Sequence, residues 1–210
     1  MLNRTKYFRK LCLSGSFLVG LISLSSTANA QFIGINVDYG IDYSAAPGKV
    51  DGYSVGIVHP APFIPNFGYS SISFSEKESI TDPSDNTSSV SLVTTTTIET
   101  INFFYNVPFP VVSIALGIGA GTMKTDTSVT ETISGTATSD NSEISTPVSE
   151  AFIHIGLPFW NTIEFHLGYH SMSVSSIDIT SKSGIVVTNY NLKKKNYTGG
   201  MTTIGVQIAF

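Results

Sequence analysis

The sequence has little charge, almost no cysteine and, beyond its first 30 residues, no long apolar run. Only 12% of its 210 residues are charged, whereas an ordinary soluble domain carries about 25%. A single cysteine, Cys12, excludes a disulfide framework and a zinc site made of thiolates. The hydrophobic content of 41% excludes a disordered chain, since disordered segments are poor in apolar residues. The composition therefore indicates one folded domain that is located in a membrane.

The first 30 residues have the three parts of a secretory signal peptide. Residues 1–10 are basic, residues 11–24 are apolar and small, and residues 27–30 end in an A-x-A pattern. We therefore expect residues 1–30 to be removed by cleavage after Ala30, which leaves residues 31–210 as the folded domain. An N-terminal membrane anchor is disfavoured, because the apolar run falls short of the roughly 20 residues that span a bilayer.

Residues 31–210 contain seven lysines, no arginine and all 15 acidic residues, which gives a formal charge of −8. Nucleic-acid binding depends on cationic contacts to phosphate. We therefore expect no nucleic-acid partner.

Beyond residue 30, apolar residues recur at every second position, which is the period of a β-strand with one apolar face. The alternation is present in six segments, namely 33–43, 53–57, 112–120, 151–157, 163–169 and 202–210. In the first segment the apolar residues occupy every odd-numbered position from Ile33 to Tyr43, which places them all on one face. Two more strands are expected near 67–75 and 92–105. In 67–75 the parity of Phe67 conflicts with that of Ile72, which suggests a β-bulge.

The connections between these strands are alternately short and long. The short ones contain Pro-Phe dipeptides, and the long ones, near 76–91, 124–146 and 173–199, are rich in Ser, Thr, Asp and Asn. Three short turns that join four hairpins give eight strands. Segments 128–133 and 177–188 keep Thr, Val and Ile near alternate positions. The long connections are therefore predicted to continue the strands, with turn residues at their tips.

The two faces of the strands favour a membrane barrel over a soluble sandwich. One face carries uncharged Val, Ile, Leu and Tyr, which suits lipid, and the other carries Gly, Ser, Asn, Asp, Glu and His, which suits a barrel lumen. The sequence therefore predicts an all-β fold: an eight-stranded antiparallel up-and-down transmembrane β-barrel with short periplasmic turns and long extracellular loops.

The last segment, TTIGVQIAF, resembles the C-terminal recognition signal of bacterial outer-membrane barrels. Terminal Phe210 follows the apolar residues Ile204, Val206 and Ile208 at alternate positions. Residues 31–210 as a whole resemble the small eight-stranded class that includes the OmpA transmembrane domain and OmpX. The resemblance implies an outer-membrane location and contact with the assembly machinery, membrane lipid and lipopolysaccharide. It also implies a structural or adhesive role in which surface loops meet an extracellular protein partner.

The lumen-facing parity includes six titratable residues, which are Asp38, Glu150, His154, Glu164, His166 and His170. We expect them to form a hydrogen-bonded polar plug, with no cofactor. His166 and His170 are separated by roughly 13 Å along one strand, so they cannot chelate one ion without another strand, and no metal is expected. The alternative is a small channel in which Glu150 and Glu164 line an ion path.

An enzyme acting on lipid A is the rival class. The segment 168–173 superficially resembles the His-x-Ser motif of lipid A deacylases, but Met172 stands where the serine is needed. Alternation also directs His170 to the lumen and Ser171 to lipid, so no catalytic residue is expected. Glycines 117, 119 and 121 relieve crowding inside a small barrel rather than form a nucleotide loop.

The one basic cluster, Lys193, Lys194 and Lys195, lies in the last long connection. It is either a solvated loop end or a contact for lipopolysaccharide phosphates.

If Phe210 completes an assembly signal, its deletion should lower the amount of folded protein in the outer membrane without changing export across the inner membrane. Fractionation of cells that express the two forms measures both quantities. Equal outer-membrane levels for the two forms would contradict the signal.

Overall fold

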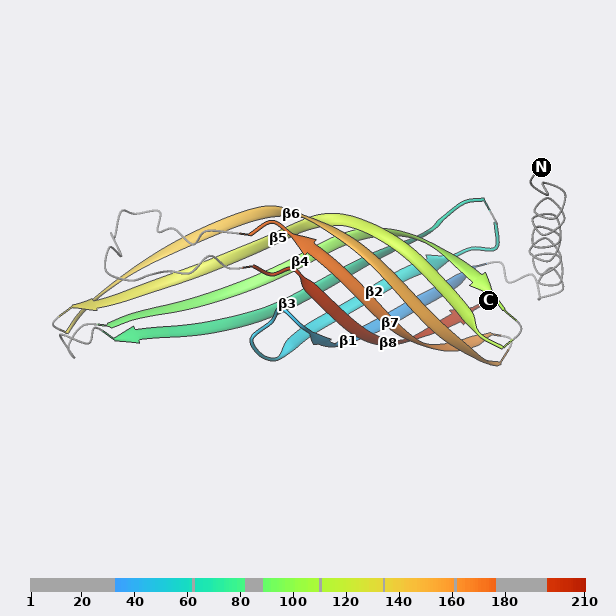
Figure 1. The fold of residues 1–210 in the computed structure, drawn as a ribbon, viewed down its shortest axis with the longest axis horizontal. Coiled ribbons are helices and arrows are strands. Elements are labelled where there is room, and N and C mark those ends of the chain that lie inside the picture. Colours follow the sequence, from blue (N-terminus) through green and yellow to red (C-terminus); the bar gives the residue numbers. More distant parts are fainter. Residues whose placement is uncertain are drawn as a thin grey trace, which may run out of the picture.

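Eight antiparallel strands follow one another in the computed structural model and close into a barrel (Figure 1). Each strand pairs with its sequence neighbours, and β1 pairs with β8 to complete the closure. The strands are β1 (Gly34–Tyr43), β2 (Val50–Val58), β3 (Asn66–Thr81), β4 (Ser89–Pro108), β5 (Ser113–Ile133), β6 (Thr136–Trp160), β7 (Ile163–Val174) and β8 (Gly199–Ala209). The predicted eight-stranded up-and-down barrel is therefore confirmed.

The structure describes residues 33–61, 63–81, 89–109, 111–133, 135–160, 162–176 and 196–210. Within these ranges, no helix has the length and apolar character needed to cross a membrane. Residues 1–32, which include the expected signal peptide, lie outside them.

Four strands continue well beyond the barrel. Strands β3, β4, β5 and β6 have 16, 20, 21 and 25 residues, whereas about 9–11 residues of a tilted strand cross a membrane. Pairing between β2 and β3 ends at Val50 and Phe74, and pairing between β6 and β7 ends at Val148 and Val174. Beyond these rungs the hairpins β3–β4 and β5–β6 project away from the end that holds the C-terminus (Figure 1). We call this part the hairpin extension, and it consists of 75–81, 89–95, 126–133 and 136–143.

The β5–β6 hairpin shows that its long connection is a continuation of the strands, as the alternation in 128–133 predicts. Pairing continues without interruption to Ile133 and Thr136. The turn between them contains Gly135 at φ 84°, a conformation that favours glycine. The corresponding segment 177–188 lies outside the described residues.

The outer wall of the barrel is apolar. Its outward side chains are exposed, as for Ile35 on β1, Phe103 on β4 and Leu167 on β7. Beyond this band, outward positions become polar at Glu99, whose carboxylate accepts a hydrogen bond from the Tyr69 hydroxyl at 2.6 Å. A continuous apolar wall of this size on a closed barrel is typical of a surface that contacts lipid.

The lumen changes from polar to apolar along its axis. At the hairpin end it is filled by a buried apolar cluster, which consists of Tyr43, Val50, Ile72, Phe74, Ile98, Met123, Val148, Met172, Val174, Tyr197 and Met201. This change explains the parity conflict in 67–75. Strand β3 pairs with β2 and β4 without a register shift, so the predicted bulge is wrong. Phe67 faces outward near the turns, whereas Ile72 faces inward where the lumen is apolar.

A β-bulge is present instead in β1. The register between β1 and β8 shifts between Gly40 and Asp42, which leaves Ile41 as the extra residue. The bulge reverses the alternation beyond it, and Tyr43 therefore points inward and is only 1% exposed. Its ring lies 5.8 Å from that of Phe74, and its hydroxyl donates to the carbonyl of Tyr197. The prediction that Tyr43 shares the outward face of Ile33 is therefore wrong.

Because the apolar cluster fills the lumen, Ile98→Ala should lower the free energy of unfolding by about 2–5 kcal/mol. Ile98 is fully buried, whereas Ile133, at the tip of the hairpin extension, is 55% exposed. Ile133→Ala is the matched control and should have little effect. Urea unfolding in detergent, followed by the fluorescence of the single tryptophan, measures both variants. Equal destabilisation would contradict this packing.

Candidate functional site in the barrel lumen

Five of the six titratable residues predicted for the lumen are buried together. Asp38 lies on β1, Glu150 and His154 on β6, and His166 and His170 on β7. We call these five residues the lumen cluster. The sixth, Glu164, is half-buried near the start of β7, at the end of the barrel that holds the short turns.

One part of the lumen cluster is a chain of three side chains. Glu150 Oε1 lies 2.6 Å from His170 Nδ1, and His170 Nε2 lies 2.9 Å from His154 Nε2. The second carboxylate oxygen of Glu150 accepts a hydrogen bond from Thr100. The ring of Phe152 stacks on His170 with a centroid distance of 4.8 Å. Both ring nitrogens of His170 and one face of its ring therefore contact neighbouring side chains. These contacts fix the orientation of the three linked side chains.

An amide completes the surroundings of Glu150. In the orientation of the Asn102 amide that gives both its nitrogen and its oxygen a hydrogen-bond partner, the nitrogen donates to Glu150 Oε2 at 2.6 Å. The oxygen accepts from the hydroxyl of Ser70 at 2.6 Å. Strands β3 and β4 therefore also hold the carboxylate in place.

The second part of the lumen cluster is a pair that joins distant segments of the chain. His166 Nε2 lies 2.5 Å from Asp38 Oδ1, and the ring of His166 stacks on that of His154 at 5.1 Å and 5°. Asp38, His154 and His166 each place one ligand atom within 4.8 Å of the others. The expectation of no metal was based on the distance between His166 and His170 along β7 alone. In the barrel, β6 pairs with β7 and β1 follows β8, so that His154 and Asp38 also lie near His166.

Glycines provide the space for these contacts. Gly205 of β8 lies between Asp38 and His166 in the pairing register, and a Cβ at this position would overlap Asp38 Oδ1 and His166 Nε2. A Cβ on Gly117 would overlap the ring of Phe152, and one on Gly119 would overlap Asn102. The prediction that Gly117 and Gly119 relieve crowding inside the barrel is confirmed. A Cβ on Gly121, the third glycine of that prediction, would overlap the backbone of Glu99 on β4.

The other predicted site residues lie elsewhere. Ile204 and Ile208 are exposed on the outer face of β8, and the backbone N–H of Phe210 donates to the carbonyl of Ile33 at 2.9 Å. Lys193, Lys194 and Lys195 lie outside the described residues. His170 is buried while Ser171 is exposed on the outer face, so the two do not form a catalytic pair.

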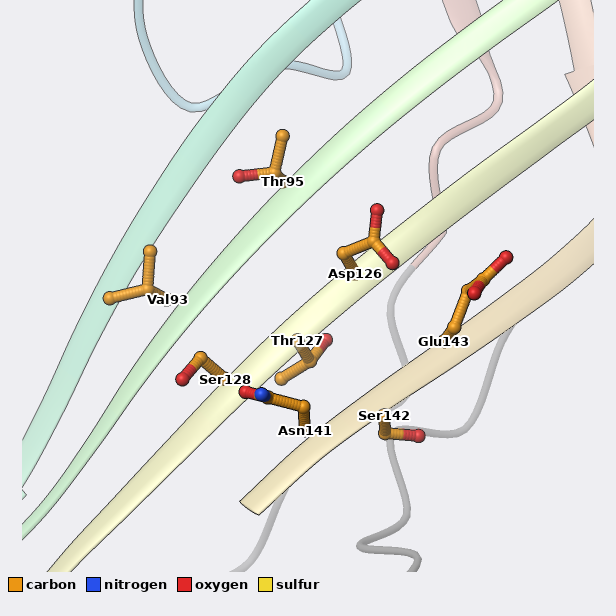
Figure 2. Close-up of a pocket in the computed structure, with 8 residues that line it drawn as sticks. All are labelled: Val93, Thr95, Asp126, Thr127, Ser128, Asn141, Ser142 and Glu143. Atoms are coloured by element: carbon orange, nitrogen blue, oxygen red, sulfur yellow. The ribbon is translucent and has the colours of Figure 1, made fainter. Parts of the chain in front are cut away.

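Sequence reasoning missed a hollow in the hairpin extension (Figure 2). Its volume is about 520 Å³, and it is lined by Val93, Thr95, Asp126, Thr127, Ser128, Asn141, Ser142 and Glu143. Asp126 of β5 is directly opposite Glu143 of β6 in the register. Figure 2 shows the two carboxylates side by side on neighbouring strands. Only the register, which sequence alone does not supply, reveals this acidic pair.

No protein-family model and no curated protein matches the chain. Several solved structures do match the chain. Neisserial surface protein A is 11% identical with a TM-score of 0.41, and 85% of this chain covers 96% of it. The N-terminal β-barrel domain of Pseudomonas aeruginosa OprF is 12% identical with a TM-score of 0.40, and 87% of this chain covers 100% of it.

The attachment invasion locus protein Ail of Yersinia pestis is 12% identical with a TM-score of 0.36, and 85% of this chain covers 96% of it. These likenesses concern the fold alone. The closed eight-stranded barrel of the chain fits the small outer-membrane barrel class that the sequence resembles.

Because a methyl group at Gly205 would separate Asp38 from His166, Gly205→Ala should lower the free energy of unfolding by about 1–3 kcal/mol. The matched control is Gly48→Ala, since a Cβ on Gly48 has no atom within 4 Å. Urea unfolding in detergent compares the two. If the Gly205→Ala protein is as stable as the Gly48→Ala protein, the lumen can accommodate an additional methyl group beside Asp38 and His166, which would contradict the close packing described here.

Proposed function

We propose that this protein is an outer-membrane β-barrel that displays the hairpin extension outside the cell, where the extension binds extracellular partners. The observation that carries the proposal is the extension itself, a sheet of four strands above an apolar barrel wall, whose two outer edges have no paired strand within the part of the chain that the structure describes. The barrel holds the protein in the membrane, and the extension supplies the binding surface.

The location rests on the distribution of apolar side chains. The outward band on the eight strands is apolar and exposed, as expected for a lipid-facing wall. Aromatic residues lie exposed at the short-turn end, among them Phe63, Phe109 and Phe159. Such residues commonly mark the interface between the bilayer and water. The short-turn end then faces the periplasm, and the hairpin extension faces outward.

The binding role rests on the open edges of the extension. Among the described residues, no strand pairs with the outer edge of β3 beyond Phe74 or with the outer edge of β6 before Val148. Open edges present backbone N–H and C=O groups that a strand of another protein can pair with. Exposed Thr and Ser side chains, such as Thr138 and Ser139, leave these edges accessible to a polar partner.

Two other functions receive less support. A channel needs an open lumen, and here the lumen cluster and the apolar cluster fill the interior, as expected of eight strands. An enzyme acting on lipid A needs a serine beside a histidine on one face, and His170 and Ser171 lie on opposite faces. Lys193, Lys194 and Lys195 are proposed to contact lipopolysaccharide phosphates.

Shortening the hairpins tests the binding role. In one variant an Asn-Gly turn replaces residues 126–143 and joins Thr125 to Ile144, which are paired in the register. In a second, the same turn replaces residues 76–94 and joins Ser75 to Thr95. Each retains every rung of the barrel, so gel mobility before and after boiling should still report a folded barrel. We expect loss of adhesion in cells that express either variant, and the greatest loss when both changes are combined.

Envelope leakage and lipid A composition are measured on the same cells. Wild-type adhesion by the double variant would contradict the proposal. A changed lipid A acyl pattern that is reproduced by His170→Ala would indicate an enzyme instead.

A further inference from the structure

We infer that Asp38, His154 and His166 form a buried site for one first-row divalent transition-metal ion, of which Zn²⁺ is the natural probe. The inference is independent of what the hairpin extension binds. It rests on the ligand atoms, on two buried atoms that have no hydrogen-bond partner, and on the chain of side chains behind His154.

The ligand set comes from three strands that meet inside the barrel. Asp38 of β1 and His166 of β7 are both next to Gly205 in the register, and His154 lies on β6, the neighbour of β7. One ligand atom from each of the three lies within 4.8 Å of the others, and all three side chains are buried. This spacing lets three atoms converge on one ion when the Asp38–His166 hydrogen bond opens and the proton on His166 Nε2 moves to Nδ1 of the same ring. The ligand atoms must then approach the ion to the usual metal–nitrogen and metal–oxygen distances of about 2.0–2.2 Å.

Two buried atoms of these three side chains have no hydrogen-bond partner among the described residues. They are Asp38 Oδ2 and His154 Nδ1. A buried polar atom without a partner is costly, because it loses its hydrogen bonds to water. Both atoms carry lone pairs when Asp38 is ionised and His154 is neutral, so a shared cation satisfies both.

The hydrogen bonds of His154 fix which nitrogen can bind the ion. With both imidazoles neutral, His170 donates its Nδ1–H to Glu150 and accepts at Nε2, so His154 must donate from its own Nε2. The remaining nitrogen, Nδ1, then holds the lone pair. Metal-binding histidines commonly have this arrangement, in which the other ring nitrogen donates toward a carboxylate. Glu150 and His170 are therefore positioning residues for the site.

The donor types select the class of ion. Two imidazoles and one carboxylate suit zinc and neighbouring first-row ions, whereas Ca²⁺ and Mg²⁺ prefer oxygen ligands alone. A fourth position is left for water, as in three-ligand zinc sites. Bound there, the ion would link β1 to β6 and β7 and so brace the closure of the barrel from inside.

Polar residues connect the site to the short-turn end. Half-buried Glu164 is two residues before His166 on the same inward face of β7, and Gln207 is its partner on β8. The amide of Asn106 donates to Gln207 at 3.1 Å. The hairpin end is closed by the apolar cluster. An ion would therefore enter from the short-turn end.

The test uses the folded chain extracted from membranes in detergent, stripped with a chelator and titrated with Zn²⁺ alone. We expect one Zn²⁺ per chain by elemental analysis and a higher unfolding temperature that the chelator reverses. Co²⁺ in the same protein should give visible absorption bands of a site with nitrogen ligands, and excess Ca²⁺ should not displace it. No stoichiometric Zn²⁺ and no Co²⁺ bands in the unaltered protein would overturn the proposal.

Variants locate the ion. His154→Gln, His166→Gln and Asp38→Asn should each remove stoichiometric binding, while Glu150→Gln should weaken it by about 10–100-fold through loss of orientation. Two matched controls should bind as the unaltered protein does: His59→Gln, at the short turn after β2, and Asp126→Asn, in the acidic pair of the hairpin extension. Gel mobility of unboiled samples reports folding of each variant. Binding that survives His154→Gln and His166→Gln in folded protein, or that is lost with His59→Gln or Asp126→Asn, would place the ion elsewhere.

Discussion

Closure of the sheet between β1 and β8 is the constraint on which the rest of the structure depends. Once each strand has a partner on both sides, the backbone polar groups of the barrel are satisfied without water. Closure also separates alternate side chains into an outer wall and a lumen, and eight strands fix the width of that lumen. Every inward side chain must then fit against those across the barrel, which is why Gly117 faces Phe152 and Gly205 lies between Asp38 and His166.

Strand number, order and most of the two faces could be predicted from sequence, because alternation reports directly which side chains avoid water. The errors occur where that link fails. Beyond the bulge at Ile41 the parity of β1 reverses, and an outward Tyr43 becomes part of the apolar cluster. At Ile72 the face is unchanged, but the lumen itself has become apolar. Neither a single extra residue in one strand nor the depth at which the lumen changes character is visible in a pattern of period two.

The candidate site was predictable as a set of residues but not as an arrangement. Parity directed Asp38, His154 and His166 inward, but only the register between strands brings them together, since Asp38 is 128 residues from His166 along the chain. The stacking of His154 on His166 depends on the same offset between neighbouring strands. The spacing of His166 and His170 along one strand, on which the expectation of no metal was based, does not include side chains from β1 and β6. Glu164 faces the lumen as His166 does, but it lies nearer the short-turn end, where its side chain is only half-buried.

The central claim is that the barrel wall faces lipid while the hairpin extension stands in water. Residues 31–210 contain no cysteine, so Leu167→Cys and Thr138→Cys each introduce one site for a nitroxide spin label. Both positions are exposed, one on the outer wall of β7 and the other on β6 in the extension. In lipid bilayers, the label at 167 should collide with dissolved oxygen and be shielded from a water-soluble nickel complex, and the label at 138 should show the reverse. Ready collision of the label at 167 with the nickel complex would contradict the account.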